Sequence, residues 1–190
     1  MKITEKQKED AEKYNTDKFG FSDKWNSHTY GEFYDELFQG SENEPLNVLE
    51  IGIYFGGSVR LFHDYLKKSN VYCIDIFDRW TYEHIEEYDR LKRYFFNAYD
   101  LSKWDELPVK KFNVIVEDGP HTYDTQLYSL NNFTPFLSWG GILAIEDVQT
   151  LHIDNLINNC TCDKSKLAVF RGSDSTIVTG DNNIIYYTNV

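Results

Sequence analysis

Short apolar runs alternate with amphipathic stretches from residue 47 to the end of the chain. Short continuous apolar runs predict buried strands, and apolar residues spaced three or four apart predict helices that pack on one face. The predicted strands cover residues 47–52, 71–76, 93–97, 112–117, 142–146, 166–171 and 183–189. The predicted helices cover residues 57–68, 82–91, 101–107, 122–134 and 149–158. This order predicts an α/β fold, a Rossmann-like doubly wound seven-stranded sheet that is mostly parallel.

The last predicted strand is expected to run in the opposite direction. It follows the turn-rich segment Thr179-Gly180-Asp181-Asn182-Asn183, with no clear helix before it. Parallel neighbours need a long crossover connection, whereas antiparallel neighbours can be joined by a short turn. We therefore expect an antiparallel last strand.

The residues before this alternation are expected to form an N-terminal helical cap. One helix face in the cap is apolar and consists of Tyr30, Phe33, Tyr34, Leu37 and Phe38. The sequence contains no repeat and no linker-like tract. We therefore expect one domain over residues 1–190, with a cap at 1–45 and an α/β core at 46–190.

Composition and charge narrow the functional classes. A chain of 190 residues with 41% hydrophobic residues can bury a core without disulfides, so the three cysteines are expected to be reduced thiols. The net charge of −12 opposes the basic surface that binds phosphate backbones, which argues against a nucleic-acid partner. The charged N-terminal run and the lack of long apolar segments predict a cytoplasmic protein without membrane insertion.

The segment from Val48 to Ser58 predicts a cofactor-binding loop between a strand and a helix. Its glycines allow a close approach of the backbone to a ligand. The spacing does not fit the dinucleotide pattern Gly-x-Gly-x-x-Gly, because Tyr54 stands at the second glycine, and no P-loop lysine follows. Asp75 ends the next predicted strand, where a carboxylate can accept hydrogen bonds from both ribose hydroxyls.

With Glu50 before Gly52 and Asp75 after the second strand, the region resembles motifs I and II of the class I S-adenosylmethionine-dependent methyltransferases. The resemblance implies S-adenosyl-L-methionine as the cofactor, a sulfonium compound without phosphate that tolerates a nearby carboxylate. The expected cofactor contacts are Glu50, Gly52, Tyr54, Gly56, Gly57, Ser58, Asp75, Asn97, Ala98 and Asp118.

Two later predicted strands also end in acidic residues, at Asp118 and at the pair Glu146 and Asp147. Oxygen ligands without cysteine suit a hard divalent cation such as Mg²⁺. A simpler alternative is that Glu146 and Asp147 only cap the following helix. His121 lies three residues after Asp118, and an imidazole with an ordinary pKa of about 6.5 is a suitable general base.

The segments Asp118-Gly119-Pro120-His121 and Gly140 to Asp147 resemble the metal-dependent sugar O-methyltransferases of the macrocin and rhamnosyl type. Upstream, Tyr14-Asn15-Thr16-Asp17-Lys18 followed by His28-Thr29-Tyr30 is similar to the segment that precedes the cofactor domain in that family. The resemblance implies metal binding by Asp118, Glu146 and Asp147 and proton removal by His121 beside Asp118. It also suggests substrate contacts from Asp17, Lys18, His28 and Tyr30.

The resemblance thus implies metal-assisted O-methylation of a sugar hydroxyl in a rhamnose-like glycan or glycoside. Two departures from the family pattern are Phe96-Asn97-Ala98 in place of Gly-Asp-Gln, and Asn15 in place of a glycine. Three alternatives stay open. The acceptor could be a catechol-like small molecule, because vicinal phenolic oxygens also chelate a metal. The chain could be an NAD-binding oxidoreductase, which Tyr54 disfavours, or an inert module that kept the cofactor loop.

Overall fold

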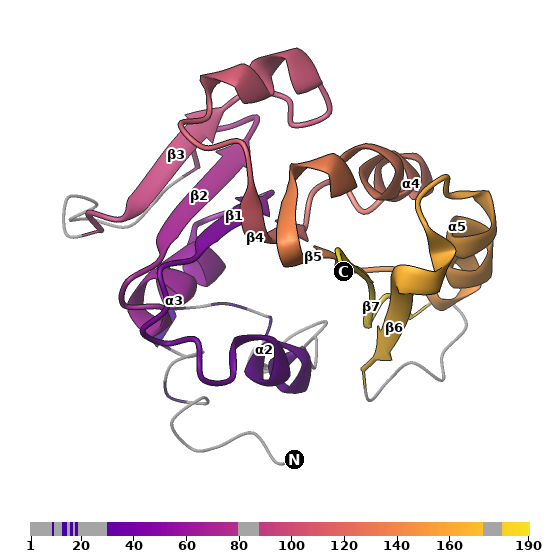
Figure 1. The fold of residues 1–190 in the computed structure, drawn as a ribbon, viewed down its shortest axis with the longest axis horizontal. Helices are drawn as coiled ribbons and strands as arrows, with labels where there is room; N and C mark the ends of the chain where they lie inside the picture. Colours follow the sequence, from indigo (N-terminus) through magenta and orange to yellow (C-terminus); the bar gives the residue numbers. More distant parts are fainter. Residues whose placement is uncertain are drawn as a thin grey trace.

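The computed structural model describes residues 9, 13, 14, 16, 18, 30–79, 88–172 and 180–190. These residues form one seven-stranded sheet (Figure 1). Its strands are β1 (Asn47–Ile51), β2 (Asn70–Asp75), β3 (Leu91–Phe95), β4 (Phe112–Glu117), β5 (Leu137–Ile145), β6 (Leu167–Arg171) and β7 (Asn183–Thr188). Their order is β3-β2-β1-β4-β5-β7-β6.

The directions of the strands confirm the predicted Rossmann-like sheet. Strands β1 to β5 pair in parallel, and β7 pairs antiparallel to both β5 and β6. The antiparallel last strand was predicted from the turn-rich segment before it, and β7 does lie between two strands of opposite direction.

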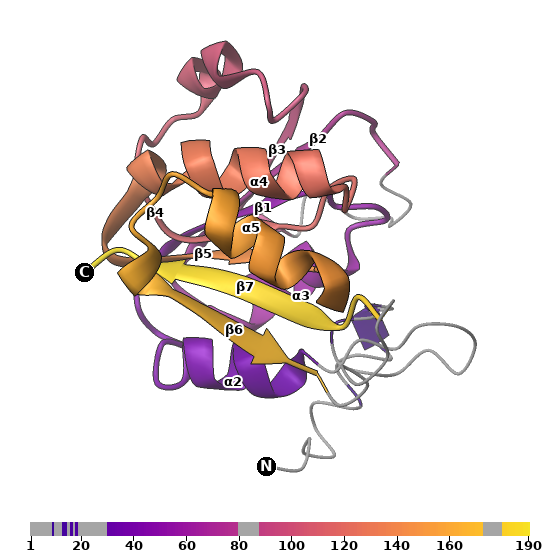
Figure 2. The same cartoon turned by 90° about the vertical axis from the view of Figure 1, so that its right-hand side faces the viewer.

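In the described parts of the chain, four α-helices with defined bounds cover the two faces of the sheet. They are α2 (Gly31–Phe38), α3 (Gly57–Tyr65), α4 (Tyr123–Asn132) and α5 (Ile153–Asn159). In Figure 2, α2 lies below the sheet, and α4 and α5 lie above it. Separate apolar clusters fill the two sides: one joins α2 and α3 to the sheet, and the other joins α4, α5 and the 3₁₀ helix η2 (Leu101–Glu106) to it.

The apolar stripe of the predicted cap is buried as expected. Phe33, Tyr34 and Phe38 of α2 point into the core, and the ring of Phe33 lies 5.7 Å from that of Phe170 and 5.3 Å from that of Tyr186. The helix therefore packs under β6 and β7 as well as against α3. Short amphipathic helices gain most of their stability from such packing, because their own backbone bonds are marginal in water.

Strand β5 is the largest departure from the predicted elements. It begins at Leu137 instead of residue 142, so Trp139, Gly140 and Gly141 lie within the strand and do not form a turn. Gly140 has φ of +74°, and the register with β4 shifts near this point. The C-terminal Asn189 exchanges two backbone hydrogen bonds with Gly140 and Gly141, and this non-local pairing keeps the segment extended.

Smaller differences occur at other boundaries. β3 begins two residues earlier than predicted because Leu91 pairs with Val71 of β2. The helix predicted over 149–158 is divided into the 3₁₀ helix η4 (Thr150–His152) and α5. Two further 3₁₀ turns are η3 (Thr134–Phe136) and η5 (Lys164–Lys166). The helix predicted over 82–91 falls mostly outside the described residues.

The strand order sets the place of the functional site. β1 lies beside β4, although β2 and β3 separate them in the sequence. The chain reverses its direction across the sheet at this point, and open α/β sheets bind ligands at the carboxyl ends of the strands beside such a reversal. Asp75 ends β2, Asp118 follows β4, and Asp147 follows β5 closely. No helix in the described parts of the chain combines the length and the hydropathy needed to cross a bilayer.

Candidate active site

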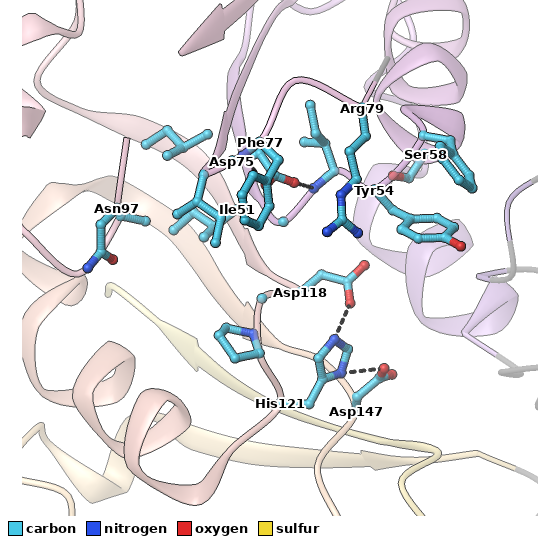
Figure 3. A pocket seen from close by; sticks show the side chains of 18 of the residues that line it. Ile51, Tyr54, Ser58, Asp75, Phe77, Arg79, Asn97, Asp118, His121 and Asp147 are labelled. Atoms are coloured by element: carbon cyan, nitrogen blue, oxygen red, sulfur yellow. Dashed lines mark hydrogen bonds and ion pairs between the residues drawn. The ribbon is translucent and has the colours of Figure 1, made fainter. Parts of the chain in front are cut away.

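A cavity of about 820 Å³ opens at the carboxyl ends of β1, β2 and β4 (Figure 3). Its lining comes from the loops after five strands, β1 to β5, and from the N-terminal cap. The loops after β1, β2 and β3 contribute Gly52, Ile53, Tyr54, Phe55, Gly57, Ser58, Asp75, Ile76, Phe77, Arg79, Phe96, Asn97, Ala98 and Tyr99. The loops after β4 and β5 contribute Asp118, Gly119, Pro120, His121 and Asp147, and the cap contributes Thr16.

The path of the glycine loop after β1 depends on how closely the end of β4 approaches it. Gly52 has φ of +81°, and a Cβ atom at this position would lie 2.0 Å from the backbone oxygen of Asp118. Only glycine therefore allows the end of β1 to approach the end of β4 so closely. Gly56, with φ of +87°, is the N-cap residue of α3. The loop thus needs these glycines for its own path, in addition to any role in cofactor binding.

Asp75 connects the first two loops of the cavity. Its Oδ2 accepts a hydrogen bond from the Ile53 backbone N–H at 2.9 Å, and its Oδ1 accepts one from the Phe77 N–H at 3.0 Å. Figure 3 shows Asp75 between Asn97 and the loop that carries Tyr54. A carboxylate has about four acceptor positions, so Asp75 retains acceptor capacity toward the cavity.

Asp118, His121 and Asp147 form a compact polar cluster on the opposite side. Asp147 Oδ2 lies 2.6 Å from His121 Nδ1, and Asp118 Oδ1 lies 3.5 Å from His121 Nε2 (Figure 3). One potential ligand atom from each of the three side chains lies within 4.8 Å of the other two. Two carboxylates and an imidazole are a donor set that suits a divalent cation.

The surrounding elements fix this cluster. His121 directly precedes Thr122, whose hydroxyl caps α4 by accepting a hydrogen bond from the Thr125 N–H at 3.2 Å. Gln126, which is fully buried on α4, donates hydrogen bonds from Nε2 to the backbone carbonyls of Glu146 and Asp147 at 3.0 and 3.2 Å. One helix therefore holds both the loop after β4 and the loop after β5.

Three cavity-lining residues other than glycine adopt a left-handed backbone conformation. The φ angles are +45° at Tyr54, +56° at His121 and +54° at Asp147. Such conformations are costly for residues with a Cβ, and they cluster at functional sites. The strain is consistent with a function for these side chains.

The two carboxylates keep a proton on His121. Burial alone would lower the pKa of His121, but the hydrogen bond and charge of Asp147, together with the charges of Asp118 and Glu117, outweigh it and raise the pKa to about 9. The imidazole is therefore protonated near pH 7 in this arrangement. The prediction of a neutral imidazole with an ordinary pKa does not hold for the cluster as it stands.

Behind the cluster, Lys18 lies in a pocket of carboxylates. Its Nζ lies 2.7 Å from Asp118 Oδ2 and 3.3 Å from Glu50 Oε1, and it also donates to Glu146 Oε2. Burial opposes the charge of Lys18, but the three carboxylates raise its pKa well above the usual value. Tyr34 of α2 donates to the other oxygen of Glu146. Both oxygens of Glu146 are thus bonded to groups from the cap.

The sequence-predicted residues fall into four groups. The cavity is lined by Gly52, Tyr54, Gly57, Ser58, Asp75, Asn97, Ala98, Asp118, His121 and Asp147. Four others are buried and are not among the described lining residues: Glu50, Lys18, Tyr30 and Glu146. Gly56 caps α3 next to the cavity. Asp17 and His28 lie outside the described residues.

Glu146 and Asp147 do not cap the helix that follows them. The N-cap residue is Gln149 in η4 and His152 in α5, and neither side chain makes a capping hydrogen bond. Instead, Tyr30 donates a hydrogen bond to Asp147 Oδ1 at 2.8 Å and accepts one from its backbone N–H at 3.1 Å. The capping alternative is therefore wrong.

Several residues of the site were missed from the sequence. Thr16 and Arg79 line the cavity, and Figure 3 shows the Arg79 side chain between Tyr54 and Asp118. Thr16 belongs to the Thr-Asp-Lys segment, which could have pointed to it. Arg79 and Gln126 belong to no recognisable motif, and only the three-dimensional arrangement brings them to the site.

Residues 49–148 match a known protein family, described as a methyltransferase domain. The demethylmacrocin O-methyltransferase of Streptomyces fradiae is 30% identical over 139 residues, which are 68% of this chain and 34% of that protein. The mycinamicin VI 2''-O-methyltransferase of Micromonospora griseorubida is 28% identical over 151 residues, 75% of this chain and 36% of that protein. The chain spans about a third of the length of these curated relatives.

Solved structures show the same fold. The MycE methyltransferase from the mycinamycin biosynthetic pathway, in complex with Mg and SAH, has a TM-score of 0.63 and 26% identity, over 83% of this chain and 40% of that chain. A complex of MycE with Mg, SAH and mycinamycin VI has a TM-score of 0.68 at 20% identity, over 95% and 54%. By its matched residues and its sheet, this chain belongs to the methyltransferase domain family.

Proposed function

We propose that this protein transfers the methyl group of S-adenosyl-L-methionine to a sugar hydroxyl of a rhamnose-like glycan or glycoside, with a divalent cation such as Mg²⁺. The observation that carries the proposal is a single cavity with Asp75 on one side and the Asp118, His121 and Asp147 cluster on the other. The relatives support the choice of acceptor, because they are O-methyltransferases and include one that acts on a rhamnosyl tetracenomycin.

Asp75, Asn97 and Ala98 line the cavity. In this proposal Asp75 accepts hydrogen bonds from the ribose hydroxyls, and Asn97 and Ala98 contact the adenine. Gly52, Gly57 and Ser58 give a wall without bulky side chains for the methionine part. When bound, S-adenosyl-L-methionine supplies an electrophilic methyl group on a sulfonium centre. The residues of the cavity orient the acceptor oxygen toward it and exclude water.

On the acceptor side, Asp118, Glu146 and Asp147 are proposed as the residues that hold the cation. A cation held by these residues would polarise the acceptor hydroxyl and lower its pKa. The oxygen donors of Asp118 and Asp147, close together at the cavity wall, fit a hard cation. Glu146 would join them by turning an oxygen from Lys18.

His121 is the proposed general base, with Asp118 beside it. Asp147 and Asp118 now hold a proton on the imidazole. When these carboxylates are engaged by a cation, that support is lost and the pKa of His121 falls toward its ordinary value. The neutral imidazole can then accept the proton of the acceptor hydroxyl at Nδ1 or Nε2.

A methyl-transfer assay with a rhamnose-bearing acceptor tests the proposal. We expect transfer that is abolished by chelator and restored by Mg²⁺, and a loss of about 10²–10⁴-fold in kcat for His121→Ala. His152→Ala is the matched control, because His152 lies at the start of α5 and does not line the cavity. Transfer undiminished by chelator would remove the metal role. Full turnover of His121→Ala would remove the role of the base, and preference for a catechol would redirect the acceptor class.

A further inference from the structure

Lys18 is bonded to the same carboxylates that the proposed ion site needs. Its ammonium contacts Asp118 Oδ2 and Glu146 Oε2, and the side chain is 1% exposed. The other oxygen of Asp118 faces His121, and the other oxygen of Glu146 faces Tyr34. Each of these two acids therefore has one oxygen committed to the lysine.

The position of Lys18 is that of a cation in a multidentate site. Three carboxylates from the ends of three neighbouring strands converge on its Nζ: Glu50 from β1, Asp118 after β4 and Glu146 after β5. An isolated buried ammonium is costly, so this arrangement is stable only while the carboxylates face it. We call these three carboxylates at the strand ends the acidic edge of the sheet. Lys18 of the cap places a buried positive charge among them.

We propose that Lys18 and the divalent ion are alternative occupants of this acidic edge. A divalent ion on Asp118 and Glu146 repels the ammonium and takes the oxygens that stabilise it. Lys18 is then released from the two acids and leaves its buried position. Tyr34, which belongs to the packed helix α2, keeps its place.

The release also affects the cavity wall. Thr16 lies two residues before Lys18, is buried, and lines the cavity. Loss of the Lys18 anchor frees this part of the wall. Ion binding is thereby coupled to the shape of the acceptor side, in addition to its chemical role. This inference rests on the ion site of the proposed function.

Amine labelling of the wild-type protein tests the inference directly. The protein is pulsed with an amine-reactive acetylating reagent in chelator and in saturating Mg²⁺, with K⁺ at matched ionic strength as the salt control, and modified lysines are quantified by peptide mass spectrometry. Lys13 is the internal reference, because its side chain is 60% exposed. We expect labelling of Lys18 to rise several-fold with Mg²⁺ while labelling of Lys13 stays constant. Equal protection of Lys18 in both conditions would overturn the inference.

A variant gives an independent measurement. Lys18→Met removes the competing charge, so we expect the dissociation constant for Mn²⁺, measured by calorimetry, to fall by about tenfold or more. Lys13→Met, the same change on an exposed lysine of the cap, should leave it unaltered. Weaker or unchanged binding in Lys18→Met would overturn the competition and leave the proposed ion site standing. Absence of Mn²⁺ and Mg²⁺ binding to the wild-type protein would overturn both.

Discussion

At the scale of single residues, Glu117 carries a buried carboxyl group directly behind the cavity. It ends β4 with 1% exposure, and its Oε1 accepts hydrogen bonds from the Tyr99 hydroxyl at 2.5 Å and from the Gly119 N–H at 3.3 Å. Burial outweighs these bonds and raises the pKa of Glu117 to about 7. The group therefore favours the protonated form in the folded protein.

This pKa predicts a pH-dependent stability. Because the folded pKa lies above the unfolded value of about 4.3, the stabilising effect is complete below pH 4.3 and is lost as the pH rises through 7. Glu117→Gln stays neutral and should avoid this loss. The free energy of unfolding of this variant, minus that of the wild type, should therefore be about 3 kcal/mol higher at pH 8 than at pH 4. Urea unfolding at both pH values measures it, with Glu106→Gln as an exposed control. Parallel pH profiles of wild type and Glu117→Gln would contradict it.

The sequence predicted the residues of the site that follow strands. Asp75, Asp118 and Asp147 could be assigned to one crevice because the carboxyl ends of parallel strands share an edge. The hydrogen bond between Lys18 and Glu146 could not be predicted from the sequence, since these residues lie 128 positions apart and no local periodicity links them. The raised pKa of His121 was also missed, because it depends on how close two carboxylates come to the ring.

At the scale of elements, α2 joins the cap to the far edge of the sheet. Phe33 takes part in this contact, because its ring meets rings from α2, β6 and β7. Phe33→Ala should lower the free energy of unfolding by about 3–5 kcal/mol, through lost burial and the cavity left behind. Chemical denaturation measures this loss, and Glu36→Ala on the exposed face of the same helix is the control. Equal stabilities of the two variants would show that α2 is not part of the cooperative core.

The elements themselves were largely predictable. Residues 112–117 form β4 as predicted, because a short apolar run between polar segments specifies a buried parallel strand well. The pattern failed at β5, where Trp139, Gly140 and Gly141 are typical of a turn and are held extended by Asn189. Local sequence cannot report a partner that is about fifty residues away.

At the scale of the whole molecule, the C-terminal strand connects the edge strand β6 to the rest of the sheet. β7 lies between β5 and β6, so β6 joins the sheet only through it. Truncation after residue 182 should therefore leave β6 unpaired, expose both apolar clusters and abolish cooperative folding. Near-ultraviolet circular dichroism and the thermal transition measure this outcome. Removal of Val190 alone, which is 56% exposed, should leave both unchanged. A cooperative transition in the longer truncation would mean that the first five strands fold on their own.

The backbone is left-handed at Tyr54, His121 and Asp147. At these positions the residue that is best for the stability of the fold differs from the residue that supplies a side chain to the cavity. Glycine would relax each backbone by about 1 kcal/mol, and it would remove the aromatic ring, the imidazole or the carboxylate from the cavity. Selection for a higher melting temperature alone would therefore favour glycine at these three positions. Keeping the native residues there preserves the side chains that line the cavity.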